Sequence, residues 1–192
     1  MLFPTFPIEL RKIIKSFADE YLFVTKHCST KLEVSKNSIC VKKKIYGCYC
    51  RAYLGSRYGT CSTNQIVRAS FSCEHGWDNK AIAVTKDKTR VDGWVSCDIN
   101  EPNWSSDSLW SDKHIFSFNT RNIDLNNTRI KRTLINLENK IITIEINKLD
   151  KIINMYTDNN LLETHLIQTH SLDNCYICVV IHSEAPERIF IL

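Results

Sequence analysis

The sequence predicts a mainly β protein, an antiparallel β-sandwich over residues 33–192 preceded by one short amphipathic helix within residues 1–32. Two observations support this fold class. Apolar residues recur with the period of an α-helix only near the N-terminus, whereas beyond about residue 33 they alternate with polar residues as in a strand. The strand-like stretches are short and end at Asn, Asp, Ser or Gly, which is typical of a β-sandwich.

The composition fits one globular domain with a buried core. The chain has 192 residues, of which 43% are hydrophobic and 24% charged. No apolar run reaches the ~18 residues that a membrane-spanning helix needs, so we expect no membrane association. The first residues lack the basic and long apolar stretches of a signal peptide, which favours a cytoplasmic or nuclear protein.

The N-terminal helix is predicted over residues 6–24. Pro7 suits the first turn of a helix, and Thr5 is a plausible N-cap. The apolar residues follow the i, i+3, i+4, i+7 and i+11 spacing that forms one stripe along a helix. The stripe consists of Leu10, Ile13, Ile14, Phe17 and Tyr21.

The strands are predicted from alternation and from β-branched or aromatic content. Residues 67–73 and 142–146 alternate most clearly, and a tight hairpin turn at Asn139-Lys140 would join residues 134–137 to residues 141–146. Residues 148–162 fit either two helical turns or a strand and a loop. The further predicted strands are residues 38–46, 80–86, 94–99, 114–118, 130–137, 163–169, 175–182 and 187–192.

Nine cysteines offer a possible metal site. Zinc is usually held by four Cys or His ligands, and one cluster of such residues, with basic and aromatic residues around it, lies within residues 40–75. Most cysteines fit strand positions as small buried residues. Cys175 and Cys178 are an odd number of residues apart in one predicted strand, so they should face opposite sides of the sheet. The candidate zinc ligands are Cys48, Cys50, Cys61, Cys73 and His75.

The charge is unevenly distributed along the chain. Residues 1–60 carry 11 Lys and Arg against 4 Asp and Glu, a net +7, and residues 61–192 carry 14 against 17, a net −3. Tyrosines lie among the basic residues of this first part, a combination that can bind a phosphate backbone and stack on bases. A nucleic-acid partner is therefore an alternative to a protein partner.

The clearest loop is residues 100–112, which is polar but contains Trp104 and Trp110. Exposed aromatic side chains bind peptides or sugars by stacking, and buried ones would fill the core instead. Both tryptophans are candidate partner-binding residues. No catalytic motif stands out, so an enzyme would need a site assembled from dispersed residues.

The first helix resembles the opening of an F-box. The matching residues are Phe6-Pro7-Ile8-Glu9-Leu10, then Ile13-Ile14, Phe17 and Leu22. The resemblance implies docking on the adaptor subunit of a cullin ubiquitin ligase. It assigns that surface to Pro7, Leu10, Ile14 and Phe17.

The C-terminal third resembles the end of a SPRY domain, a β-sandwich that binds peptides or proteins through its loops. Residues 134–146 resemble the late hairpin of that family, and residues 175–181 with residues 187–191 resemble its closing strand pair. Together the two resemblances imply a protein-interaction module, such as a ubiquitin-ligase substrate receptor. The alternatives are a zinc-stabilised nucleic-acid-binding or regulatory module centred on residues 40–75, and an enzyme.

Overall fold

A computed structural model describes twelve stretches of the chain, and all the regular secondary structure in them is β. The stretches are residues 22–37, 40–43, 50–54, 66–77, 80–86, 114–118, 122–125, 128–131, 137–168, 171–173, 175–181 and 187–192. No helix long and apolar enough to cross a membrane occurs in them. The strands are β1 (Phe23–Cys28), β2 (Leu32–Val34), β3 (Cys40–Lys43), β4 (Cys50–Leu54), β5 (Ile66–Cys73), β6 (Lys80–Thr85), β7 (His114–Phe118), β8 (Asn122–Leu125), β9 (Thr128–Lys131), β10 (Ile142–Asn147), β11 (Ile152–Thr157), β12 (Asn160–Leu166), β13 (Tyr176–Ile181) and β14 (Arg188–Ile191).

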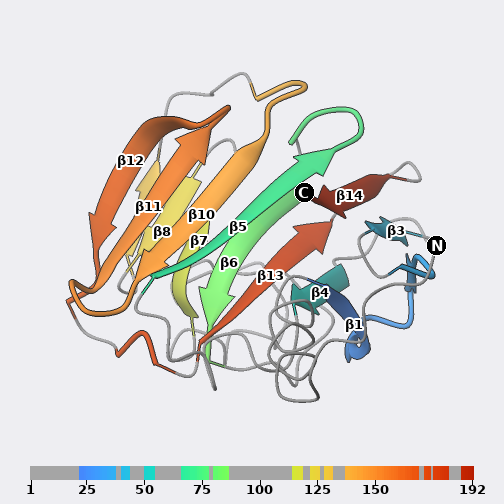
Figure 1. Ribbon diagram of the computed structural model, residues 1–192, viewed down its shortest axis with the longest axis horizontal. Helices are drawn as coiled ribbons and strands as arrows, with labels where there is room; N and C mark the ends of the chain where they lie inside the picture. The colour runs from blue at the N-terminus through green and yellow to red at the C-terminus, as the bar shows by residue number, and fades with distance from the viewer. Residues whose placement is uncertain are drawn as a thin grey trace, which may run out of the picture.

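The strands form two seven-stranded antiparallel sheets. Sheet A has the order β1-β4-β13-β6-β7-β8-β9, and sheet B has the order β12-β11-β10-β5-β14-β3-β2. Figure 1 shows β10, β11 and β12 of sheet B in front of β7 and β8 of sheet A. The predicted antiparallel β-sandwich is therefore confirmed.

One hydrophobic core fills the space between the two sheets. Every second side chain of a strand points inward, so alternate positions of β5, β10 and β13 are buried there. Burying each large aliphatic or aromatic side chain contributes about 1.5–3 kcal/mol. Central members of this core are Phe71, Ile144 and Ile153 from sheet B, and Ile82, Phe116 and Ile177 from sheet A.

The outer faces of the two sheets differ in exposure. The outward side chains at the centre of sheet A are also buried, and six of them form a second apolar cluster: Tyr53, Ala81, Ala83, Tyr176, Cys178 and Val180. Arg51 is buried on the same face and donates from Nη1 to the Tyr53 hydroxyl at 3.4 Å. The outward side chains of β5, β10, β11 and β12 in sheet B are largely polar and, apart from the buried Thr143, reach solvent. Among the side chains that the structure describes, the outward positions of β5, β10, β11 and β12 are therefore more open than those at the centre of sheet A.

Several strand predictions are confirmed and others were missed. The alternating stretches became β5 and β10, and residues 80–86, 114–118 and 187–192 contain β6, β7 and β14. Residues 148–162 contain all of β11 and the start of β12, so their helical alternative is wrong. No strand was predicted for β1, β2, β4 or β8. The predicted strand at residues 94–99 lies outside the described residues.

Residues 1–32 were predicted as a helical segment separate from the sandwich. Their last part instead belongs to the sandwich, because β1 pairs with β4 and Phe23 and Leu32 lie in the core. Phe23 also corrects the end of the helix predicted over residues 6–24. Residues 1–21 of this segment lie outside the described residues.

The turn predicted at Asn139-Lys140 exists, but the predicted hairpin around it is wrong. Asn139 has a positive φ of 56°, and the Lys140 amide donates to the Leu137 carbonyl at 3.1 Å. However, β10 pairs with β5 along one edge and with β11 along the other. No edge of β10 remains for residues 134–137.

Short turns connect β10, β11 and β12 into a meander. Asp158 and Asn159 both have positive φ, as a two-residue type I′ turn requires, and they join Thr157 to its partner Asn160. In the turn before β11, Asn147 accepts from the Asp150 amide at 3.1 Å and donates to the Asp150 carboxylate at 2.7 Å. These turns fix the register of the three strands.

Lys80 and Trp77, both buried, connect three segments at one end of the sandwich. Lys80 points inward beside Ile82, and its ammonium group donates to the Gly76 carbonyl at 2.7 Å and pairs with the Glu187 carboxylate. Nearby, buried Trp77 donates from Nε1 to the Lys140 carbonyl at 3.0 Å. The β5–β6 turn, the start of β14 and the turn before β10 are thereby joined.

We predict that Lys80→Met destabilises the protein by about 3–5 kcal/mol, because it leaves a mostly buried carboxylate without its cation. Urea unfolding followed by tryptophan fluorescence measures the change in the free energy of unfolding. The double variant Lys80→Met with Glu187→Gln should recover part of the loss. A single variant as stable as the wild type would show that the ion pair does not hold this end of the sandwich.

Candidate interaction surface

The open face of sheet B carries three cross-strand rows of outward side chains on β5, β10, β11 and β12. The strand register sets each row, because paired residues of antiparallel strands point to the same side. We call these twelve residues the Glu145 face. They are Ile66, Asn147, Ile152 and Leu166 in the first row, Arg68, Glu145, Asn154 and Thr164 in the second, and Ser70, Thr143, Tyr156 and Leu161 in the third.

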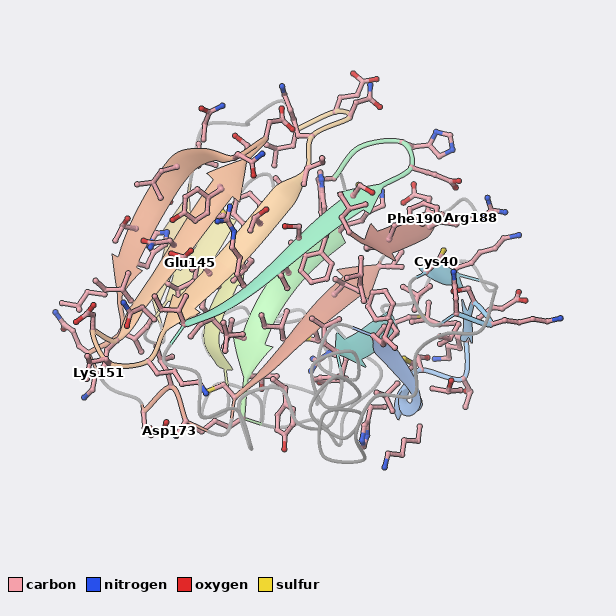
Figure 2. All side chains as sticks on the ribbon, viewed as in Figure 1. Cys40, Glu145, Lys151, Asp173, Arg188 and Phe190 are labelled. Carbon is pink, nitrogen blue, oxygen red and sulfur yellow. The ribbon has the colours of Figure 1, made fainter. Side chains whose placement is uncertain are left out.

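Glu145, labelled in Figure 2, is the centre of a hydrogen-bond network on this face. Its Oε1 atom accepts from the Asn154 amide at 3.0 Å and from the Tyr156 hydroxyl at 3.1 Å. Its Oε2 atom lies 4.0 Å from Nη1 of Arg68. The side chain is only 18% exposed, and these partners offset the cost of removing a carboxylate from water.

Arg68 and Tyr156 also contact each other. The guanidinium carbon of Arg68 lies 4.9 Å from the centre of the Tyr156 ring, within the range of a cation–π interaction. Desolvation raises the pKa of Tyr156, as do its hydrogen bond to Glu145 and the charge of Glu145, while Arg68 and Asn154 lower it. The Tyr156 hydroxyl therefore stays protonated at neutral pH and donates to the carboxylate.

Two further side-chain hydrogen bonds link neighbouring strands of this face. Thr164 donates to the Asn154 side-chain oxygen at 2.8 Å, which continues the central row to β12. Ser70 and Thr143 share a hydrogen bond of 2.8 Å between β5 and β10. Each of the four strands is thus linked to its neighbour by a side-chain interaction as well as by the backbone.

Exposed aliphatic side chains lie at three corners of this polar surface. Ile66, Leu161 and Leu166 are 55%, 57% and 53% exposed. Single exposed apolar residues are common, and these three lie around the ordered polar centre of the face.

Solved structures share this architecture. The SPRY domain of human HERC1 matches with a TM-score of 0.62 and 14% identity, over 88% of this chain and 96% of that chain. The chain has the fold of SPRY domains. The TRIM65 PSpry domain matches with a TM-score of 0.61 and 8% identity over 99% of both chains. The NHR1 domain of Drosophila melanogaster Neuralized matches with a TM-score of 0.53 and 10% identity, over 88% of this chain and 96% of that chain.

No protein-family model and no curated protein sequence matches the chain. The matches to solved SPRY domains confirm the predicted SPRY-like β-sandwich as a fold. The residues predicted to bind partners lie outside the described residues, and their roles stay predictions. They are Pro7, Leu10, Ile14 and Phe17 of the predicted helix, and Trp104 and Trp110 of the predicted loop.

The zinc candidates of the SPRY-like domain fall partly within the described residues. Cys50 is buried on the inner side of β4 in sheet A, and Cys73 is at the end of β5 in sheet B, where its thiol donates to the Gly76 carbonyl at 2.8 Å. His75 is exposed in the following turn. The described residues contain no group of three or more possible metal ligands. Cys48 and Cys61 lie outside them, so the zinc site stays a prediction.

The other cysteines mostly fill apolar positions. Cys175 lies in the core between the sheets and Cys178 in the cluster on the outer face of sheet A, which confirms that they point to opposite sides. Burial raises the pKa of Cys28, Cys73 and Cys175 to about 12 and that of Cys178 to about 11. These thiols are therefore protonated at neutral pH, whereas a nucleophilic cysteine acts as the thiolate.

The Glu145 face was missed because no single stretch of sequence displays it. The alternation in β5 and β10 places Arg68 and Glu145 on the outward side, and that much was readable. The pairing of Arg68 with Glu145, Asn154 and Thr164 depends on a register across four strands. That register is set by the turns and by the core.

We predict that Glu145→Gln lowers the pKa of Tyr156 part of the way back to its ordinary value. The substitution removes the charge that raises this pKa, and the desolvation of Tyr156 remains. Because folding favours the protonated phenol, its contribution to stability is present below pH ~10 and is lost as the pH rises through the folded pKa. This alkaline loss should be smaller in the variant.

A pH titration of tyrosine ring carbons by NMR measures the shift. Glu163→Gln is the matched control, since Glu163 is on β12 opposite the inward-facing Met155 and should leave the Tyr156 titration unchanged. An unchanged Tyr156 pKa in Glu145→Gln would contradict the network.

Proposed function

We propose that this SPRY-like domain is a protein-interaction module and that the Glu145 face is its docking surface. Two facts support the proposal. Domains of this fold generally mediate protein–protein interactions. Among the described residues, sheet B has an open and ordered outer face, whereas the centre of the outer face of sheet A is buried.

The order of the polar side chains is the observation that carries the proposal. Binding usually costs about 0.5–1.5 kcal/mol for each flexible side chain that becomes fixed. Glu145, Asn154 and Tyr156 already hold one another in the unbound domain, so this cost is reduced. The partner would meet a surface whose hydrogen-bonding groups are already oriented.

The chemistry of the face suggests what the partner offers. Glu145 is occupied by its own neighbours, whereas the Arg68 side chain is 47% exposed and can donate outward. A carboxylate or backbone carbonyl group of the partner would bind Arg68. Apolar side chains of the partner would cover Ile66 and the two exposed leucines of β12.

We predict that Arg68→Glu weakens partner binding about tenfold or more, which corresponds to about 1.4 kcal/mol. The substitution removes the outward donor and leaves two carboxylates side by side on β5 and β10. Peptides selected from a displayed library against the wild-type domain serve as the probe, and calorimetry measures their affinity for each variant.

Lys36→Glu is the matched control, because it makes the same change of charge at an exposed residue in the β2–β3 turn at the other end of sheet B. Selected peptides should keep their affinity for it. Circular dichroism verifies that both variants are folded. Equal affinities of Arg68→Glu and wild type would place the docking surface elsewhere.

The narrower proposal is a substrate receptor of a ubiquitin ligase. It rests on the resemblance of residues 6–22 to an F-box, in which the predicted helix holds the ligase adaptor and the SPRY-like sandwich holds the target. The ordered target surface and the adaptor surface would then lie on different parts of one chain.

We predict that the double variant Leu10→Asp with Ile14→Asp abolishes binding to the purified adaptor, because it places two charges in the apolar stripe of the predicted helix. The variant should bind displayed peptides as the wild type does. Wild-type protein that does not bind the adaptor would refute the ligase role and would leave the interaction module standing.

A further inference from the structure

The outer face of sheet B continues beyond the Glu145 face, from β5 onto β14 and β3. On β14, Ile189 and Ile191 point into the core, so the alternate residues Arg188 and Phe190 point outward. The strand register aligns these two with outward residues of β5 and β3. We call the six residues the Arg188 patch. They are Ser72, Phe190 and Cys40 in one row, and Glu74, Arg188 and Lys42 in the next.

The Arg188 patch is partly open to solvent. The Arg188 side chain is 44% exposed, and Cys40, Lys42 and Phe190 are half-buried. Figure 2 labels Cys40, Arg188 and Phe190 close to one another, on the part of sheet B away from Glu145. Aromatic residues and Arg are enriched in protein interfaces, so an outward phenylalanine beside two cations favours a role in binding.

Two cations face each other in the second row of the patch. Arg188 lies directly opposite Lys42, and like charges in this arrangement repel each other. Each cation has an acid on its far side. Nη1 of Arg188 lies 3.1 Å from Oε1 of Glu74, and Lys42 lies opposite Glu33 of β2. An anion above the centre of the row would therefore be closer to both cations than to either acid.

The thiol of Cys40 reports the sign of the electric field beside these cations. Desolvation is the main cause of the raised pKa of Cys40, and the charges that act on it are, in order of size, those of Arg188, Glu74 and Lys42. Both cations lower this pKa, and the effect of Arg188 exceeds the opposing effect of Glu74. The described charges therefore favour a negative charge at this place, although burial of the thiol opposes it.

We propose that the docking surface extends over the Arg188 patch, where Arg188 and Lys42 bind an acidic side chain of the protein partner. Phe190 packs against an apolar side chain next to that acid. The inference rests on the proposed function, because it adds a second part to the same docking surface and names the chemistry of its partner. The occupant is a protein segment with acidic groups at two places, one at Arg68 and one at the pair of cations.

The size of the surface supports one partner across both parts. A specific protein–protein interface usually takes about 20–30 residues from each side, and the Glu145 face has twelve. β5 joins the two parts, since Arg68 belongs to the face and Glu74 to the patch. These two residues are six positions apart, which corresponds to about 20 Å along a strand. An extended segment of similar length in the partner spans the distance.

Selective alkylation of Cys40 measures the field without any partner. Iodoacetate and iodoacetamide alkylate the same thiolate, but only iodoacetate is an anion. The ratio of their rates at Cys40 therefore reports the local potential and cancels differences in exposure and in thiol pKa. Peptide mass spectrometry separates Cys40 from the other cysteines. Arg188→Gln and Lys42→Gln should each lower the ratio about twofold or more at low ionic strength.

Glu74→Gln is the opposing variant, because removal of the acid should raise the ratio. Lys36→Gln is the matched control and should leave it unchanged. Lys36 is exposed in the turn before β3, and its charge is not among the described charges that shift the pKa of Cys40. Equal ratios in the wild type, Arg188→Gln and Lys42→Gln would overturn the inference. So would a Cys40 that neither reagent modifies, because the patch would then be closed.

Peptide binding tests the docking role of the patch. The affinity of the library-selected peptides should fall about threefold or more in the double variant Arg188→Gln with Lys42→Gln, and it should rise in Glu74→Gln. Replacing the acidic residue of a peptide by its amide should cost affinity for the wild type but not for the double variant. Selected peptides without an acidic residue would overturn the inference.

The two proposals fail in different ways. Weaker binding to Arg68→Glu, with unchanged binding to the double variant, would overturn the inference and leave the proposed function standing. Unchanged binding to both would overturn both proposals. Circular dichroism verifies that every variant is folded.

Discussion

The packing of two sheets around one core is the constraint on which the rest of this structure depends. It requires every second side chain of the central strands to be apolar, as Ile142, Ile144 and Ile146 are on β10. The alternate positions are then assigned to an outer face. At the centre of sheet A that face is buried as well, as Tyr53 and Cys178 show, whereas in sheet B the outward side chains of β5, β10, β11 and β12 mostly reach solvent.

The outer face of sheet B shows how a strand can bear polar residues and still be ordered. Glu145, Asn154 and Tyr156 satisfy one another across β10 and β11, and Arg68 adds a charge and a ring contact from β5. None of these residues contributes to the core. Their mutual hydrogen bonds offset the cost of removing the mostly buried Glu145 carboxylate from water.

Much of the sandwich was predictable, and the failures have physical causes. β5 and β10 alternate cleanly because one side is buried and the other is open. β4 was missed because all five of its residues are buried, including Arg51, so no alternation marks it. Residues 148–162 stayed ambiguous because Ile152 and Ile153 are adjacent, one outward and one inward, which also fits a helix. The Glu145 face required the register of four strands, and a single sequence does not contain it.

The most direct test is hydroxyl-radical footprinting of the unbound domain, which oxidises side chains in proportion to their contact with water. The account predicts rapid oxidation of Ile66 and Tyr156 on sheet B and slow oxidation of Tyr53 and Tyr176 on sheet A. Leu161 and Leu166 are more than half exposed and should also react. Rapid oxidation of Tyr53 and Tyr176 with protection of Tyr156 would contradict the assignment of the open face to sheet B.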